Sequence, residues 1–262
     1  MLARWRDWLQ RRRMARAPQA VDDWPAAFAR VPVLAHWPQA DRERLQQLAL
    51  DFLAGKTLEP VADAAIDRPQ ALAIALQAVL PVLNLGLDWY AGWHAVVLYP
   101  DEFRSRFEEV DEAGVVHQVD DWRSGESWAA GPLILSLADV AAGGQGAGHN
   151  VVIHECAHKL DQVDGDSNGH PPLHPGMDPA AWTAAFADAY RHLGRRALRR
   201  LRTVLDPYAA QSPAEFFAVA SELFFDDPPS LRDGYPAVYA QLALFYRQDP
   251  AAHWAAQSID EP

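Results

Sequence analysis

Residues 148–161 read GHNVVIHECAHKLD. The glycine-rich loop before them and the polar residues that follow it predict a helix over 149–160. On that helix His154 and His158 are four residues apart, so their imidazoles project from one face and can bind one Zn²⁺. Glu155 lies beside the first histidine, where it can take a proton from water. The alternative is two structural histidines and a surface glutamate, but the apolar Val-Val-Ile before them indicates burial, and burying such groups without a function is costly.

A zinc site of this kind needs a third protein ligand and keeps its fourth position for water. Asp164 has the spacing of the third ligand in metzincin-like motifs, but those motifs need a glycine at the bend, where this chain has Asp161. A glutamate from a later helix, as in thermolysin-like sites, is the other choice. Glu215 is our predicted ligand, with Glu222 second, although an acid near a helix N-terminus is also favoured by the helix dipole alone.

The composition limits the classes of protein to which this chain can belong. It has 262 residues, of which 50% are hydrophobic and 22% charged, enough for a sizeable buried core. Its single cysteine excludes an internal disulfide and a cysteine-rich zinc site, and suits a reducing cytoplasm, where we expect the protein. A net charge of −12 argues against direct binding to nucleic acid. The longest apolar stretch, residues 71–87, is too interrupted to span a membrane.

The pattern along the chain predicts a mainly helical α+β protein with a small β-sheet. Residues 1–20 are expected to form a basic N-terminal arm, and residues 21–262 a single compact unit. Within that unit, residues 21–90 are helical and residues 91–262 form the core that carries the histidines. The other elements that we expect are helices over 40–53, 69–85, 180–205, 213–225 and 236–247 and strands over 94–99, 115–119 and 132–136.

Positive charge is concentrated in two runs, although the chain as a whole is acidic. Residues 1–16 contain six arginines, and another six lie between Arg191 and Arg202. Such runs are most often solvated helix faces. An acidic partner or an anionic membrane surface is the alternative reading of each.

Four stretches of the sequence occur together and in a recognisable order. They are LNLGLDWY at 83–90, SGESW at 124–128, GHNVVIHE-x-A-HKLD at 148–161 with Gly165 after it, and Y-A-A-x-x-PAE-x-FAV-x-SE at 208–222. With them, the chain resembles the Mlc titration factor A family of bacterial zinc peptidases, whose catalytic core is similar to that of the lethal-factor-type toxins. The similarity covers almost the whole chain beyond the N-terminal arm.

The resemblance implies a zincin fold, in which a small sheet lies beside the active-site helix, and one Zn²⁺ per chain. It implies that Glu215 completes the metal site and that Tyr208, seven residues earlier, is the active-site phenol. Asp161 matches the HKLD of the family, where a carboxylate one turn after a ligand histidine can support it.

The same resemblance implies a zinc metallopeptidase that acts on short peptides or exposed termini, as an aminopeptidase does, through a water activated by the metal. The rival function is that of a regulatory binding protein, because the family is named for sequestering the transcriptional repressor Mlc. In that case peptidase activity is secondary. The sequence offers three surfaces for such a contact, namely the apolar residues 71–90 and the two arginine runs.

Two features depart from the family pattern. Cys156 stands where a bulky apolar residue is expected, and we interpret it as a small buried hydrophobic residue. The loop that contains His170 and His174 is specific to this chain. A second metal site there is the alternative to two solvated histidines, which are the commoner case.

Overall fold

The computed structural model describes most of the chain. The described residues are 23–101, 103–110, 116–123, 125–127, 131–165 and 167–254. The basic arm predicted at 1–20 lies outside them, so both the arm and the boundary after it stay predictions.

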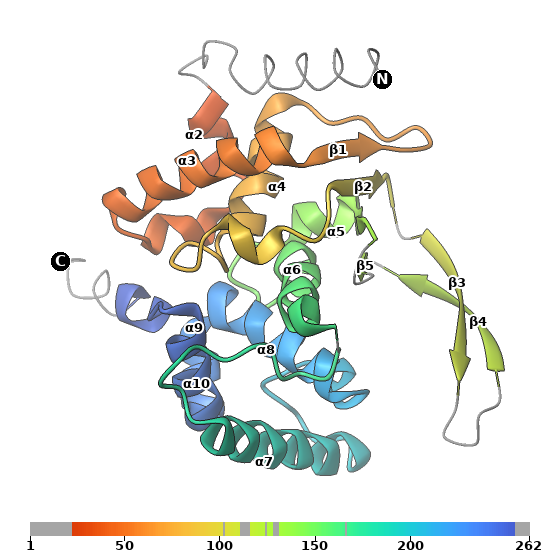
Figure 1. Cartoon of the computed structure of the whole chain (residues 1–262), viewed down its shortest axis with the longest axis vertical. Helices are drawn as coiled ribbons and strands as arrows, with labels where there is room; N and C mark the ends of the chain where they lie inside the picture. The colour runs from red at the N-terminus through yellow and green to blue at the C-terminus, as the bar shows by residue number, and fades with distance from the viewer. Residues whose placement is uncertain are drawn as a thin grey trace.

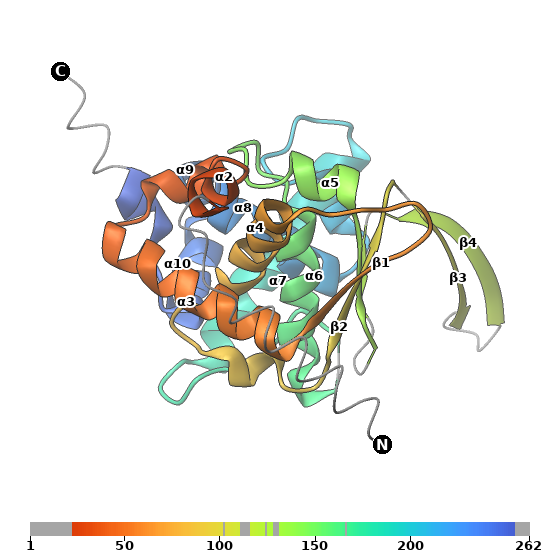
Figure 2. The same cartoon turned by 90° about the horizontal axis from the view of Figure 1, so that it is seen from above.

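A small sheet lies on one side of the molecule (Figures 1 and 2). Its strands are β1 (Thr57–Pro60), β2 (Ala95–Tyr99), β5 (Gly125–Ser127) and β6 (Leu133–Ser136). Their order is β1-β2-β6-β5, where β1, β2 and β6 are parallel and β5 is antiparallel. A separate antiparallel pair, β3 (Phe103–Val110) and β4 (Val116–Arg123), extends away from it in both views.

Helices make up most of the N-terminal half. They are α2 (Asp23–Phe28), α3 (Gln39–Gly55) and α4 (Arg68–Val79), with short 3₁₀ turns η1 (Pro32–His36) and η2 (Leu87–Tyr90). One of them, α3, contacts strand β1 of the sheet. Asp67 caps α4 by accepting a hydrogen bond from the backbone N–H of Gln70, whose side chain bonds back to Asp67. The helix predicted over 69–85 is too long, since α4 ends two residues before Pro81, which cannot donate to the helical ladder.

The C-terminal half is almost entirely helical. Its elements are α5 (Leu137–Ala142), α6 (Val151–Asp161), η3 (Gln162–Asp164), α7 (Pro179–Leu198), η4 (Pro207–Ala210), α8 (Pro213–Asp226), α9 (Pro228–Gly234) and α10 (Pro236–Tyr246). The predicted helix over 180–205 is wrong at its C-terminal end. Arg200 has a left-handed backbone, with φ of +51°, and the chain leaves the helix there.

Helix α6, which carries the two histidines, is the centre of the fold (Figure 1). It packs against α4 and α8 and against strands β5 and β6. Buried hydrophobic residues from Ala27 to Ala251 form one continuous cluster around it. The structure therefore confirms a mainly helical α+β fold with a small sheet beside this helix. None of the described helices has both the length and the apolarity needed to cross a membrane.

The loop into α6 depends on a glycine. Gly148 has φ of +81°, and a Cβ there would lie 2.5 Å from Cδ1 of Leu223. The end of the Leu223 side chain can shift to make room for a Cβ, so the left-handed backbone is the main reason why Gly148 cannot easily be replaced by another residue. The Gly148 N–H donates to Oδ2 of Asp226 at 2.7 Å, which attaches the loop to α8.

We predict that Gly148→Ala lowers the free energy of unfolding by about 1–3 kcal/mol, the usual cost of a non-glycine residue held in this backbone region. Urea unfolding measures it. Gly194→Ala is the matched control, because Gly194 has open space around it within α7. It should stabilise the protein by about 0.5–1 kcal/mol. Equal stability of Gly148→Ala and wild type would contradict the role given to this turn.

Candidate metal centre

The N-terminus of α6 is fixed by side chains from α8. Asn150 is the N-cap, and its side chain accepts from the Ile153 N–H at 3.1 Å. The N–H of Asn150 itself donates to Oε2 of Glu222 at 2.6 Å. On α8, Ser212 caps the helix by accepting from the Glu215 N–H, as the Ser-Pro start of this segment predicts. The two helices are thereby held together at the site.

Three side chains bring their donor atoms to one point. Nε2 of His154 lies 3.1 Å from Nε2 of His158 and 3.1 Å from Oε2 of Glu215. The distance from Nε2 of His158 to the same carboxylate oxygen is 3.5 Å. A tetrahedral ion with bonds of about 2.0–2.1 Å holds its ligand atoms about 3.3 Å apart. The spacing of these three atoms therefore fits one metal ion, with a further position left open.

The charges at this point also favour a cation. Burial by itself lowers the pKa of His154, but hydrogen bonds to Glu215 and Glu222 outweigh burial and raise that pKa well above its ordinary value. Burial raises the pKa of Glu215, yet its contacts with the two histidines outweigh this and hold the carboxyl pKa below its usual range. The carboxylates thus stabilise positive charge at the imidazoles, which is the charge that a metal ion supplies.

Glu222 lies behind His154 and not among the three donors. Its Oε1 is 2.7 Å from Nδ1 of His154, the ring nitrogen that faces away from Glu215. Glu222, our second choice of metal ligand, therefore contacts a ligand histidine and does not reach the point where the three donors meet. A carboxylate on the far nitrogen fixes the tautomer and the orientation of a ligand histidine. The spacing of residues in the sequence does not reveal the contact between Glu222 and His154, because that contact depends on how α6 and α8 cross.

The two aspartates considered in the sequence lie elsewhere. Asp164 is exposed in η3 and does not belong to the group of converging donors. Asp161 is fully buried, and its Oδ2 accepts from the Gly169 N–H at 2.8 Å. Its Oδ1 and Nδ1 of His158 have no hydrogen-bond partner within the described part of the chain. Asp161 thus anchors the following loop. It also lies close enough to His158 to interact with it electrostatically, although no hydrogen bond joins the two.

Glu155 and Tyr208 flank the three donors. Glu155 follows His154 on α6, is 4% exposed and lies close enough to act on the pKa of His154. Tyr208 is in η4, whose N-cap Asp206 accepts from the Tyr208 N–H. The phenol ring is 6.2 Å from the ring of His154, centre to centre, and 42% exposed. An exposed phenol beside the donors is accessible to a bound substrate.

The other residues singled out in the sequence, Cys156, His170 and His174, pack against neighbouring residues away from the three donors. Cys156 is fully buried, and burial raises its thiol pKa to about 12, as expected for a packed hydrophobic residue. His174 stacks on Phe245 and lies 2.8 Å from its carbonyl oxygen. His170 packs on Trp182 instead. The described residues contain one group of converging metal-binding side chains, and neither loop histidine is part of it.

Comparisons with known proteins identify the family of this chain. The model of the glucose-regulated metallo-peptidase M90 family matches residues 5–247. The chain belongs to that family. A protein named Mlc titration factor A from Enterobacter sp. (strain 638) is 38% identical over 236 residues, which cover 89% of both chains. The protein of the same name from Edwardsiella ictaluri (strain 93-146) is 40% identical over 230 residues, 87% of each chain.

The contact of Glu222 with His154 predicts an effect on metal affinity. Glu222→Gln should weaken metal binding by about 10–100-fold, because a neutral amide holds the imidazole less firmly. Gln keeps an acceptor for the Asn150 N–H, so the helix start is preserved. Competition with a chelating dye measures the affinity. Glu59→Gln, at an exposed glutamate of β1, is the control. Unchanged affinity of Glu222→Gln would remove this residue from the metal centre.

Proposed function

We propose that this protein is a zinc-dependent peptidase whose metal is held by His154, His158 and Glu215. The observation that carries the proposal is the triangle of donor atoms with edges of 3.1, 3.1 and 3.5 Å. Two imidazoles and one carboxylate with an open fourth position are a common donor set of catalytic zinc, and are less typical of structural sites. Membership of a metallo-peptidase family supports the same conclusion.

The chemistry divides among the residues around this donor set. A zinc ion bound there supplies Lewis-acid activation of a water molecule and of the scissile carbonyl. Glu155 accepts the proton of that water and then delivers it to the leaving amine. Tyr208 donates a hydrogen bond from its phenol to the oxyanion that develops on the carbonyl oxygen. Glu222 keeps the ring of His154 in its binding orientation.

A peptide is the substrate class that the surroundings favour. Strand β5 is the end strand of the sheet within the described residues, and it packs against α6. The free backbone groups of an end strand can pair with an extended peptide. Short peptides or exposed termini reach such an edge more readily than a folded chain does. A cytoplasmic location and one zinc per chain complete the proposal.

We propose a second, regulatory role as the alternative. Its support is the name of the relatives, Mlc titration factor A, which points to binding of a repressor. The apolar residues 71–90 are a poor contact surface, because residues 72–79 are all buried in α4. The arginines after Arg191 are mostly exposed and remain available for contact.

Glu155→Gln separates chemistry from binding. It should leave the zinc content at one ion per chain and reduce turnover by about 10²–10⁴-fold, the usual contribution of a general base. Metal analysis and hydrolysis of a panel of short peptides and amino-acid p-nitroanilides measure the two quantities.

The control for contaminating protease is Glu43→Gln, an exposed change on α3, purified in parallel. Wild-type turnover by Glu155→Gln would exclude Glu155 as the base. A cellular effect that survives in Glu155→Gln would favour the regulatory role over the peptidase. Protein purified without any bound zinc and unable to bind it would overturn both the metal site and the peptidase proposal.

Tyr208→Phe tests the phenol. We expect a fall in kcat of about 10²–10³-fold, with KM and zinc content nearly unchanged, because one oxyanion donor is lost. The exposed position of Tyr208 makes a folding defect a poor explanation of such a fall. Tyr190→Phe, which loses a hydrogen bond to the carbonyl oxygen of Ala210 at the end of η4, is the comparison variant. Normal kcat in Tyr208→Phe would mean that this residue has no part in the reaction.

A further inference from the structure

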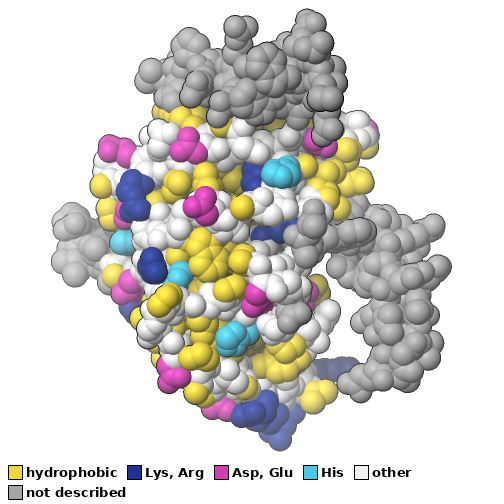
Figure 3. Space-filling view, viewed as in Figure 1, with side chains coloured by type: hydrophobic (Ala, Val, Ile, Leu, Met, Phe, Trp, Pro, Cys, Tyr) yellow, Lys and Arg dark blue, Asp and Glu magenta, His cyan; other side chains and the backbone are white. Residues whose placement is uncertain are grey.

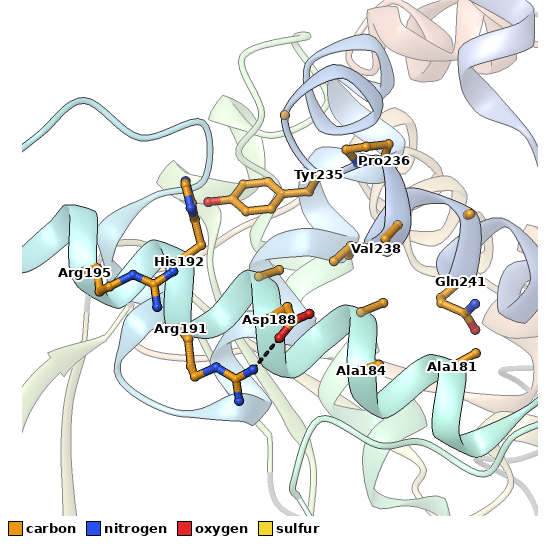
Figure 4. Close-up of a pocket in the computed structure, with 15 residues that line it drawn as sticks. Ala181, Ala184, Asp188, Arg191, His192, Arg195, Tyr235, Pro236, Val238 and Gln241 are labelled. Atoms are coloured by element: carbon orange, nitrogen blue, oxygen red, sulfur yellow. Dashed lines mark hydrogen bonds and ion pairs between the residues drawn. The ribbon is translucent and has the colours of Figure 1, made fainter.

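A groove outside the metal centre lies between α7 and α10 (Figure 4). Its volume is about 960 Å³, near the upper end for ligand sites in proteins. One side is made of alanines that recur every three or four residues along α7, such as Ala181, Ala184 and Ala185. Tyr235, Pro236 and Val238 form the opposite side. The alanines leave the helix surface open to close approach by another chain.

One end of this groove carries two arginines and a histidine beside one aspartate. Arg191, His192 and Arg195 line it, and Tyr235 lies edge-on to the ring of His192. Figure 4 shows Arg191 paired with Asp188. No carboxylate of the described residues lies within 4 Å of the Arg195 guanidinium, and the same is true of Arg199. In Figure 3, the Lys and Arg side chains gather over this end of the molecule.

The basic end continues into an exposed apolar residue. Leu198, on the last turn of α7 and three residues after Arg195, has 88% of its side chain exposed. Beyond the helix, Leu201 and Val204 are each nearly half exposed among further arginines. A concentration of like charge costs free energy through repulsion unless an opposite charge neutralises it. Exposed leucines beside it indicate a partner that brings both apolar groups and negative charge.

Gln241, on α10, is a further polar residue of the groove lining. Oε1 of Gln241, on the α10 side, is buried and has no hydrogen-bond partner among the described residues. Leaving such an acceptor without a donor costs about 1–3 kcal/mol. Because this oxygen has almost no exposed surface, a peptide N–H can reach it only if the Gln241 amide turns toward the groove.

We propose that this groove binds an acidic, partly apolar segment of another protein. Apolar side chains of the segment lie against the alanines of α7, and its carboxylates pair with Arg195 and Arg199, which have no carboxylate partner among the described residues. A concave site favours a peptide segment over a bilayer, which cannot enter it. None of the lining residues belongs to the metal centre, so this interaction is independent of the proposed peptidase chemistry.

A defined peptide library tests the proposal. Random 12-residue peptides displayed on phage are selected on the full-length protein, and the enriched sequences are synthesised with a fluorescein label. We expect the enriched peptides to be acidic, and their anisotropy to report binding that weakens as NaCl rises from 50 to 300 mM. Arg195→Glu should raise Kd at least about tenfold by placing like charges together. Ala184→Trp should do so by filling the groove.

Matched variants make each result specific. Ala180→Trp places the same bulk at an exposed site of α7 outside the groove, and Arg30→Glu reverses a charge near α2. Both should bind like wild type, as should Glu155→Gln.

Three results would overturn the proposal: enriched peptides that are not acidic, acidic peptides whose Kd is unchanged in Ala184→Trp and Arg195→Glu, or peptides that lose binding only in Glu155→Gln. Sedimentation with phosphatidylglycerol vesicles that needs Arg195, in the absence of peptide binding, would instead assign the basic surface to lipid.

Discussion

The contact between α6 and α8 is the interaction on which the candidate site depends. Three acidic residues of α8 face α6 along its length. Glu215 joins the two histidines, Glu222 holds both His154 and the N–H of Asn150, and Asp226 accepts from Gly148. A helix N-terminus favours nearby negative charge, since its first N–H groups are unpaired and carry the positive end of the dipole. Glu222 therefore serves both purposes, since it orients His154 and accepts from the N–H of the N-cap residue Asn150.

The local pattern of residues predicts the parts of the site that lie on one helix. A spacing of four residues fixes His154 and His158 on one face, whatever the rest of the fold does. Glu215 is predicted from the acidic residues of a later helix and is also implied by the family resemblance, whereas Tyr208 rests on the resemblance alone. The partner of His154 was not predictable in this way. The sequence offers Glu222 as a second candidate ligand and Asp161 as support for His158, and only the packing of α8 on α6 brings Glu222 to the imidazole of His154.

The sequence likewise predicts some elements of the fold and not others. The strongly apolar helices and the strands of the sheet core follow from periodicity, and the prediction of a small sheet beside α6 is confirmed. The end of α7 was misplaced by several residues, since nothing in a run of arginines marks Arg200 as the left-handed residue that ends it. The sequence does not predict strand β1, because the strand is only four residues long and ends in a proline. Its pairing with β2 is what makes it a strand.

The separation of the site residues along the chain has a consequence for folding order. His154 and Glu215 lie about 60 residues apart, so closing that long loop is a late and entropically costly step. While the chain is being synthesised, α6 can form before α8 exists, but its two histidines then lack both the third donor and the carboxylate that orients them. Early capture of an ion by the two histidines alone is correspondingly weak. In the proposed metal centre, full affinity for an ion therefore requires the docked pair of helices.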